Sequence, residues 1–311
     1  MRKSLILIVI LAAAAAGQQT KRKGTGHVSG GQPEAPIPEN VQYVRDVEFC
    51  KGGGHPLLLD WYIPKERPHK PSPVVIWIHG GGWVGSDKSE NQIPVFLSAR
   101  GWMVASINYR LSGEATFPAA IEDCKCAIRY VRANAAKYEI DPQRIGLVGS
   151  SAGAHLSLLA GLADEKAGLE GTGGWPGVSS RVAAVASLKG VSDFTVGHKA
   201  FQDGQGIAPS RFLGGTMEEK PEAYRKASPL TWLSPDDPPI LLLHGDDDTT
   251  VPYDQSVKLK KAYDKLGLHA ELVPIAGATH LLRRRDGSPA GMSLQQIYAR
   301  IAEFFQQTLK P

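Results

Sequence analysis

One segment is the most informative about the fold: Ile145-Gly146-Leu147-Val148-Gly149-Ser150-Ser151-Ala152-Gly153. An apolar run ends in the pattern Gly-x-Ser-x-Gly, and the residues that follow, Ala152 to Ala163, suit a helix. A serine on a sharp turn between a strand and a helix leaves no room for side chains two positions before and after it, which explains both glycines. We therefore predict that Ser151 stands exposed at the N-terminus of a helix, whose dipole favours developing negative charge.

Around this turn, the chain alternates between apolar runs and helical patterns. Most of the runs are rich in Val, Ile and Leu without alternation, as expected for parallel strands buried on both faces, and the first two predict an antiparallel hairpin. The alternation predicts an α/β domain. The expected strands cover Val41 to Phe49, Leu57 to Ile63, Val74 to Ile78, Met103 to Ile107, Ile145 to Val148, Val182 to Leu188, Ile240 to Leu243 and Ala270 to Ile275. The expected helices cover Asn91 to Arg100, Pro118 to Tyr138, Ala152 to Ala163, Tyr253 to Leu266 and Ser293 to Leu309.

Two stretches, Asp164 to Ser180 and Phe194 to Leu230, break this alternation. Insertions of this kind usually carry loops, so we expect them to lie over the strand ends as loops or a small cap.

The composition suits one large globular domain: 311 residues, 42% hydrophobic and 21% charged. The net charge of +4 is concentrated at the N-terminus, where five basic residues and no acidic ones fall within the first 23 residues. The rest of the chain has 30 basic and 31 acidic residues. A nearly neutral body of this kind excludes the basic footprint of a nucleic-acid-binding protein.

The N-terminus is typical of an export signal. Two basic residues precede an apolar run of 12 residues, Leu5 to Ala16, which ends in small residues. A membrane-spanning helix needs about 20 apolar residues, so a membrane anchor is the weaker alternative and we expect no stable membrane association. We predict a signal peptide at 1–17, a flexible linker at 18–40, the α/β domain at 41–311, and a secreted or periplasmic protein.

Export permits disulfides, but the sequence has three cysteines, Cys50, Cys124 and Cys126. Cys124 and Cys126 lie two apart in a predicted helix and point to different faces. The sequence leaves open a pairing of Cys50 with either of them and three buried thiols.

A glycine-rich loop follows the strand predicted at Val74 to Ile78, with the sequence His79-Gly80-Gly81-Gly82-Trp83. Consecutive glycines let the backbone approach a ligand closely and direct N–H groups toward it, as the stabilisation of a tetrahedral oxyanion requires. We predict an oxyanion hole made by the N–H groups of Gly81, Gly82 and Ala152.

An acid and a base follow the last two predicted strands. Three carboxylates, Asp246, Asp247 and Asp248, come after the run Ile240 to Leu243, and we expect one of them to orient a histidine. Alone, such a triplet would indicate a helix cap, a solvated turn or a weak calcium site. His280 follows the last buried run and is the candidate general base.

We expect other roles for the remaining histidines. His155 lies one helical turn after Ser151 and should pack against the sheet, whereas His79 and His244 should shape the loops that they begin. Five more are expected at the surface or in the linker: His27, His55, His69, His198 and His269.

Together these motifs resemble the α/β-hydrolase superfamily, and within it the hormone-sensitive-lipase-like and carbohydrate (acetyl and feruloyl) esterases. The order Ser151, Asp248, His280 is the order expected of that fold. The acid of such families lies in a frame like His-Gly-x-x-Asp-x-x-Val-Pro, which selects Asp248 among the three carboxylates. The resemblance implies an α/β-hydrolase fold, with a mostly parallel sheet flanked by helices, an antiparallel N-terminal hairpin and a small cap.

The resemblance also implies a serine esterase that forms an acyl-enzyme and needs no metal or cofactor. Ser150 stands where many hormone-sensitive-lipase relatives have an acid, which favours a carbohydrate esterase acting on a small-molecule or polysaccharide ester. Trp83 and Ser150 are candidate substrate-binding residues. The alternatives are a serine peptidase or amidase with the same triad, and a non-catalytic binding protein on the same scaffold. Further candidates for a sugar-facing cleft are Gly52, Gly53, Trp175 and Trp232.

Overall fold

A computed structural model describes residues 34–67, 71–196 and 209–309. The predicted signal peptide at 1–17 and residues 18–33 of the predicted linker lie outside these ranges. Eight strands form one sheet in the order β1-β2-β4-β3-β5-β6-β7-β8. Their bounds are β1 Val41–Gly52, β2 His55–Pro64, β3 Ser72–Ile78, β4 Met103–Ile107, β5 Ile140–Ser150, β6 Ala184–Leu188, β7 Ile240–Gly245 and β8 Ala270–Ile275.

The sheet is mostly parallel and begins with an antiparallel hairpin, as predicted. Strand β2 is antiparallel to both β1 and β4, whereas every pairing from β4 to β8 is parallel. The carboxyl ends of the parallel strands therefore meet at one edge, where ligand sites of open α/β sheets are found.

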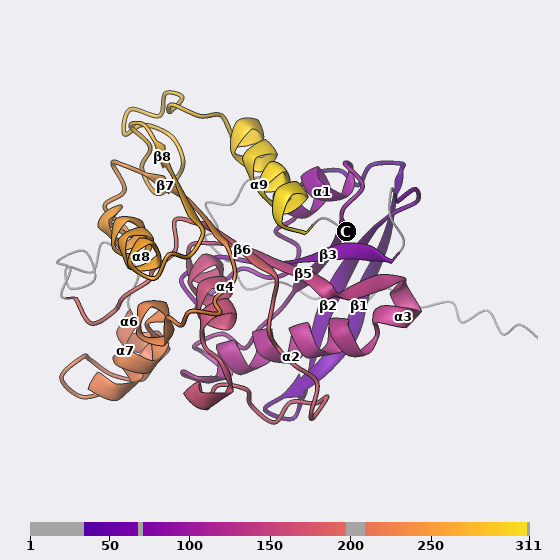
Figure 1. Cartoon of the computed structure of the whole chain (residues 1–311), viewed down its shortest axis with the longest axis horizontal. Coiled ribbons are helices and arrows are strands. Elements are labelled where there is room, and N and C mark those ends of the chain that lie inside the picture. The colour runs from indigo at the N-terminus through magenta and orange to yellow at the C-terminus, as the bar shows by residue number, and fades with distance from the viewer. Residues whose placement is uncertain (1–33, 68–70, 197–208, 310–311) are drawn as a thin grey trace, which may run out of the picture.

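Helices cover both faces of the sheet, and a hydrophobic core lies on each side (Figure 1). Helices α1 (Gln92–Ser98) and α9 (Leu294–Thr308) pack on one face. The other face carries α2 (Ala119–Ala133), α4 (Ala152–Leu162) and α8 (Asp254–Lys265), with the short α3 (Ala135–Tyr138) after α2. Every residue of α4 is buried, which fixes the helix that begins directly after Ser151.

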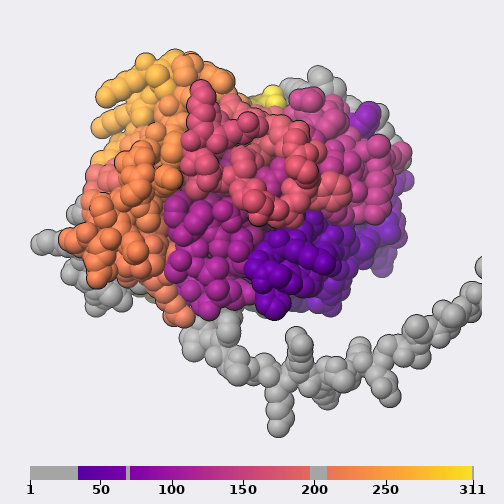
Figure 2. All heavy atoms as spheres, turned by 90° about the horizontal axis from the view of Figure 1, so that it is seen from below, coloured from indigo at the N-terminus to yellow at the C-terminus, as the bar shows by residue number. Residues whose placement is uncertain are grey.

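Residues 164–180, here named the strap, do not lie over the strand ends as expected. After a short 3-10 helix, η1 (Glu165–Ala167), the strap runs along the flank of α2. The Glu170 carboxylate pairs with Lys125 Nζ at 2.7 Å and Arg129 Nη1 at 2.8 Å, both on α2. Because these two cations are almost completely buried, they need a local carboxylate partner, and this need draws the strap onto α2. Figure 2 shows that the atoms of this region adjoin both α2 and the β1–β2 hairpin.

A disulfide joins Cys50, near the end of β1, to Cys126 on α2, and Cys124 is a buried free thiol. This is one of the pairings that the sequence left open. The strap covers the bond, because a Cβ atom on Gly174 would lie 3.5 Å from the Cys50 sulfur. Trp175 Nε1 donates to the carbonyl oxygen of Phe49 at 3.1 Å, which links the strap to β1.

The second insertion contributes α6 (Pro209–Leu213), α7 (Pro221–Ala227) and a 3-10 helix, η2 (Pro229–Trp232). Residues 197–208 of this insertion lie outside the described ranges. The ring of Phe212 stacks on Trp83, with ring centroids 4.7 Å apart, so α6 lies against the glycine-rich loop at the strand ends, as a small cap would.

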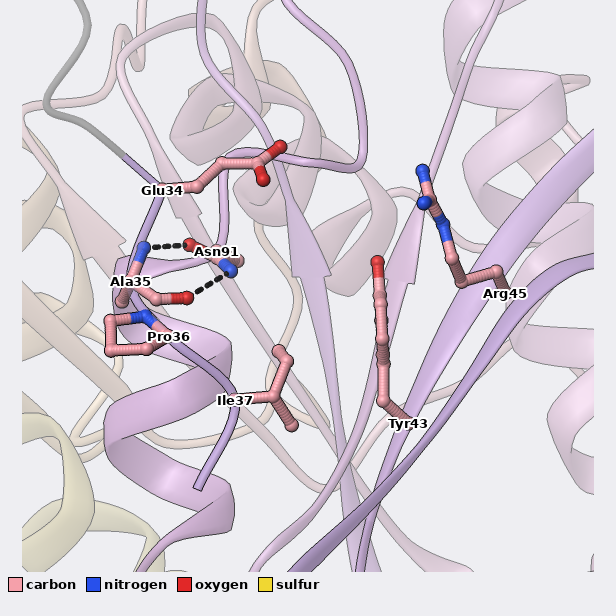
Figure 3. A pocket seen from close by; sticks show the side chains of 7 residues that line it. All are labelled: Glu34, Ala35, Pro36, Ile37, Tyr43, Arg45 and Asn91. Atoms are coloured by element: carbon pink, nitrogen blue, oxygen red, sulfur yellow. Dashed lines mark hydrogen bonds between the residues drawn. The ribbon is translucent and has the colours of Figure 1, made fainter. Parts of the chain in front are cut away.

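Residues 34–40, predicted to end a free linker, pack against the domain instead. The backbone of Ala35 exchanges two hydrogen bonds with the side chain of Asn91, at 2.8 and 2.9 Å (Figure 3). This segment, Tyr43 and Arg45 line a cavity of about 280 Å³. Nowhere in the described ranges does a helix have both the length and the apolar character needed to cross a bilayer.

Candidate active site

Ser151 lies on a strained turn between β5 and α4, with φ 55° and ψ −117°. This conformation is rare for a residue with a side chain. A Cβ atom on Gly149 would lie 2.3 Å from the carbonyl of Gly153, and one on Gly153 would lie 2.0 Å from the carbonyl oxygen of Ile78. Both glycines are therefore required by backbone packing, as the sequence predicted, and they let the serine stand at the end of β5.

Three residues distant in sequence meet at this turn. Ser151 Oγ lies 2.9 Å from His280 Nε2, across 129 positions of the chain. His280 Nδ1 lies 2.7 Å from Asp248 Oδ2. The serine, the histidine and the acid that the sequence singled out thus form one continuous hydrogen-bonded chain.

The Asp248 carboxylate is buried and ionised. Its Oδ1 accepts hydrogen bonds from the backbone N–H groups of Thr250 and Val251, both at 2.9 Å. Burial opposes ionisation, but hydrogen bonds from His244 and His280 hold the pKa of Asp248 well below its ordinary value. An ionised Asp248 accepts the Nδ1 proton of His280, which leaves Nε2 free to accept from the serine hydroxyl.

His280 is held in its neutral form. Burial lowers the pKa of His280 below its ordinary value, and although the hydrogen bond to Asp248 raises it, the charge of Lys189 and the neighbouring His244 act with burial. A neutral imidazole is the form that can take a proton from a serine.

The other two carboxylates of the triplet have different partners. Asp246 Oδ1 accepts from the backbone N–H of Gly277 at 2.6 Å, and Asp247 pairs with Arg285 at 2.6 Å. Within the described ranges, no group of three or more His, Cys, Asp or Glu side chains is arranged to hold a metal ion.

The glycine-rich loop lies beside Ser151. Gly80 packs on the turn, since a Cβ atom there would lie 2.9 Å from the Ser150 carbonyl oxygen and 3.6 Å from Ser151 Cβ. Tyr109 fixes the loop, because its hydroxyl contacts the carbonyl oxygens of His79 and Gly80, each at 3.1 Å.

The predicted oxyanion donors have the backbone freedom that their role needs. Gly81 has φ +94°, and a Cβ atom on it would lie 2.2 Å from the Gly85 carbonyl oxygen. Gly82 has φ +61°. Among the described residues, the N–H groups of Gly81, Gly82 and Ala152 donate to no protein acceptor, which leaves them available to a ligand.

We expected Trp83 to face a substrate cleft, but its side chain is fully buried. Its ring stacks on Phe212, and its Nε1 donates to His155 Nδ1 at 3.2 Å. His155 in turn contacts the carbonyl oxygen of Ala227 through Nε2 at 2.7 Å, so it packs against the loop and α7 rather than the sheet. The two rings thus join the glycine-rich loop to the cap from inside.

The other proposed substrate contacts have the following surroundings. Ser150 directly precedes Ser151 at the end of β5 and is buried. Gly52 lies beside Arg110, and next to it Gly53 has φ +57° in the hairpin turn. Trp232 Nε1 donates to the Lys226 carbonyl at 2.8 Å. Trp175 borders a shallow cavity of about 480 Å³ next to the disulfide.

The remaining described histidines behave as expected. His79 Nδ1 contacts the Gly80 carbonyl oxygen at 2.9 Å, and His244 bridges Ser256 Oγ and the Val251 carbonyl oxygen, each at 2.8 Å. His55 and His269 are exposed. His27, His69 and His198 lie outside the described ranges.

Two charged residues near the site were missed by the sequence reasoning. Lys189 follows β6, and its Nζ donates to the His280 carbonyl oxygen at 2.6 Å. Glu90 Oε2 accepts from Ser86 Oγ at 3.1 Å and, at 3.4 Å, from the backbone N–H of Gly80. Lys189 directly follows a buried apolar run, as Ser151 does. Its place near the site could therefore have been predicted from the sequence by the same pattern.

Comparisons with known proteins identify the family of the chain. The BD-FAE family model matches residues 59–263. Esterase LipQ of Mycobacterium tuberculosis is 34% identical over 228 residues, 72% of this chain and 54% of LipQ. Esterase LipC of the same organism is 30% identical over 86% of this chain and 69% of its own length. The chain thus spans about half of LipQ and two thirds of LipC.

A solved structure described as a truncated form of carbohydrate esterase from gut microbiota is similar with a TM-score of 0.74 and 31% identity. The similarity covers 88% of this chain and 99% of that one. From the match across its central 205 residues, together with the sheet order and the serine turn, the chain belongs to the BD-FAE family and has the α/β-hydrolase fold.

Proposed function

We propose that this protein is a carboxylic-ester hydrolase that acts through an acyl-enzyme on Ser151. The observation that carries the proposal is the hydrogen-bonded chain from Ser151 Oγ through His280 to Asp248, at 2.9 and 2.7 Å. The names of the relatives LipQ and LipC, both called esterases, support it.

In the first half of the reaction, His280 Nε2 takes the proton of Ser151 as the serine oxygen attacks the ester carbonyl. Asp248 holds the imidazole in the tautomer that this step needs and stabilises the positive charge that it acquires. The imidazolium then protonates the leaving alcohol, and the acyl group remains on Ser151.

The negative charge that develops on the carbonyl oxygen rests on the N–H groups of Gly81, Gly82 and Ala152. Backbone donors held in a folded loop stabilise an oxyanion without the reorganisation that water would need. Loss of one such donor typically costs about 3 kcal/mol of transition-state stabilisation. In the second half of the reaction, His280 activates a water molecule that releases the acid.

For the substrate, we propose short-chain acyl, acetyl or feruloyl esters of carbohydrates. The support is that the similar solved structure is described as a carbohydrate esterase. The described residues add one constraint: Trp83 is buried beneath the glycine-rich loop, so its ring does not form a sugar platform.

Initial rates across matched substrates test both parts of this proposal. Acetyl, butyryl, octanoyl and feruloyl groups would each be carried on p-nitrophenol, on free sugars and on a xylan oligomer, with a p-nitroanilide as the amide. We expect the highest kcat/KM for acetyl or feruloyl sugar esters and negligible amide cleavage. A preference for octanoyl esters would overturn the substrate class, and faster amide than ester cleavage would overturn the ester hydrolase.

We also propose that the protein is exported. The support is the charged and apolar pattern at 1–17, together with the Cys50–Cys126 disulfide, since disulfides persist in oxidising compartments. Expression of the full chain in a bacterial host, followed by fractionation and N-terminal sequencing, tests this. Mature protein outside the cytoplasm that starts near residue 18 is the expected result, whereas an uncleaved cytoplasmic chain would refute export.

A further inference from the structure

Lys189 is attached to the catalytic histidine through the main chain. It follows β6 with φ +53°, and its own N–H donates to the Leu243 carbonyl oxygen at 2.8 Å. Its half-buried side chain ends at the carbonyl oxygen of His280, where Nζ donates at 2.6 Å. The lysine therefore links the loops after β6 and β8, which flank the loop that carries Asp248.

The environment of this ammonium group is unusual for a lysine. Within the described ranges, no carboxylate oxygen lies within ion-pair distance of Lys189 Nζ, although the charges of Asp248 and Glu90 act on it from further away. Burial lowers the pKa of Lys189, and those two carboxylates oppose this effect. A half-buried cation whose direct partner is a backbone carbonyl costs folding free energy, which calls for a functional explanation.

We propose that Lys189 is a positioning residue for His280: its ammonium group, which is hydrogen-bonded to the main-chain carbonyl of that histidine, holds the His280 loop and acts on the imidazole through its charge. This inference rests on the proposed function, because it assigns a role toward the general base of that reaction. It adds a charged residue that the triad alone does not require.

The charges around His280 determine the direction in which its pKa should move when Lys189 is replaced. Asp248 favours the protonated imidazole, whereas Lys189 and His244 disfavour it. On the histidine's own loop, Arg285 is neutralised by Asp247. Without the Lys189 charge, the effect of Asp248 on the imidazole is opposed less strongly. The pKa of His280 should therefore rise.

The test is the pH dependence of serine reactivity in three variants of the full chain. Lys189→Met removes the charge and the hydrogen bond, Lys189→Gln removes only the charge and keeps a donor, and Lys189→Arg keeps the charge. Lys166→Met is the matched control, because it removes an equal charge from a side chain that is 92% exposed on η1. Two rates would be followed from pH 4.5 to 9: phosphorylation of Ser151 by paraoxon and hydrolysis of p-nitrophenyl acetate.

We expect the midpoint of the acid limb to rise by about 0.5 to 1 pH unit in Lys189→Met and Lys189→Gln. Lys189→Arg and Lys166→Met should keep the wild-type midpoint. A loosened loop alone would lower the rates at all pH values without moving the midpoint, so this readout separates positioning by charge from a purely structural role.

An unmoved midpoint in Lys189→Gln, or an equal shift in Lys166→Met, would overturn the inference while leaving the proposed function intact. Lys189→Gln keeps the test decisive if Lys189→Met fails to fold. If the wild-type chain neither hydrolyses the ester nor reacts with paraoxon at Ser151, the proposed function fails as well.

Discussion

His280 Nδ1 lies 2.7 Å from Asp248 Oδ2, although three successive aspartates are available on that loop. Asp246 turns to the backbone of Gly277, and Asp247 turns to Arg285 at the surface. The three carboxylates therefore have different roles: Asp246 binds the backbone of a neighbouring loop, Asp247 forms a surface ion pair, and Asp248 is the buried partner of the histidine.

Replacement of Asp248 by Asn should therefore lower kcat by about 10³ to 10⁴-fold, because an amide in that position favours the wrong imidazole tautomer. Steady-state kinetics on p-nitrophenyl acetate measure this fall. Asp247→Asn is the matched control and should stay within a few-fold of wild type, since its ion pair is largely solvated. If Asp246→Asn or Asp247→Asn lost activity while Asp248→Asn kept it, the assignment of the acid would be wrong.

The acid limb of kcat/KM should have its midpoint below pH 6.5, the ordinary value for a histidine. Burial lowers the pKa of His280, so its neutral form persists to lower pH than that of a free imidazole. Because the base acts in its neutral form, activity should fall only as the pH drops through this lowered value. Rates measured at constant ionic strength give the midpoint, and one clearly above 6.5 would contradict the neutral, buried base.

Stability should fall with acidification through two buried histidines outside the triad. Burial lowers the pKa of both His79 and His155 from 6.5 to about 4. In the unfolded chain these histidines take up a proton near pH 6.5, whereas in the folded protein they do so only near pH 4. The free energy of unfolding is therefore unaffected by them above pH 6.5 and falls as the pH drops toward 4, by at most about 3 kcal/mol per histidine.

Urea unfolding at pH 7.5 and at pH 5 measures this loss. The variant His155→Gln keeps an acceptor for Trp83 and a donor for Ala227 but cannot take up a proton. It should lose less stability between the two pH values than wild type does, and an equal loss in both proteins would rule out the contribution of His155.

Reduction of the Cys50–Cys126 disulfide should destabilise the protein without abolishing the site. The bond closes a loop of 76 residues, for which chain entropy gives about 4 kcal/mol. Thermal unfolding of the double variant Cys50→Ala/Cys126→Ala should show a clearly lower Tm than wild type. Cys124→Ala, which removes the buried free thiol, is the control and should be affected much less.

The positions of the strands along the chain could be predicted, because unbroken Val, Ile and Leu runs have few alternatives in an α/β domain. Their order in the sheet was not predicted, and some strands extend beyond the predicted bounds: β5 covers Ile140–Ser150 rather than Ile145 to Val148. The places of Ser151, His280 and the three aspartates followed from the same pattern, since each comes after a buried run and parallel strands end at one edge. The choice of Asp248 among the three came from the family resemblance. The steric need for Gly149 and Gly153 was equally local.

What escaped prediction depends on contacts between distant segments. The fully buried ring of Trp83 depends on Phe212, which lies in an insertion without a recognisable pattern. The path of the strap depends on one lysine and one arginine of α2, Lys125 and Arg129, which both pair with Glu170. The partner of Cys50 follows from the side of α2 that faces β1, and Lys189 was passed over because its contact is to a backbone atom.

The proposed reaction requires the hydroxyl of Ser151 as its nucleophile. The direct measurement is the kcat/KM of Ser151→Ala on p-nitrophenyl acetate, with the neighbouring Ser150→Ala as the control. We expect a fall of at least about 10⁴-fold for Ser151→Ala and a far smaller change for Ser150→Ala. Turnover by Ser151→Ala close to that of wild type would contradict this role of Ser151.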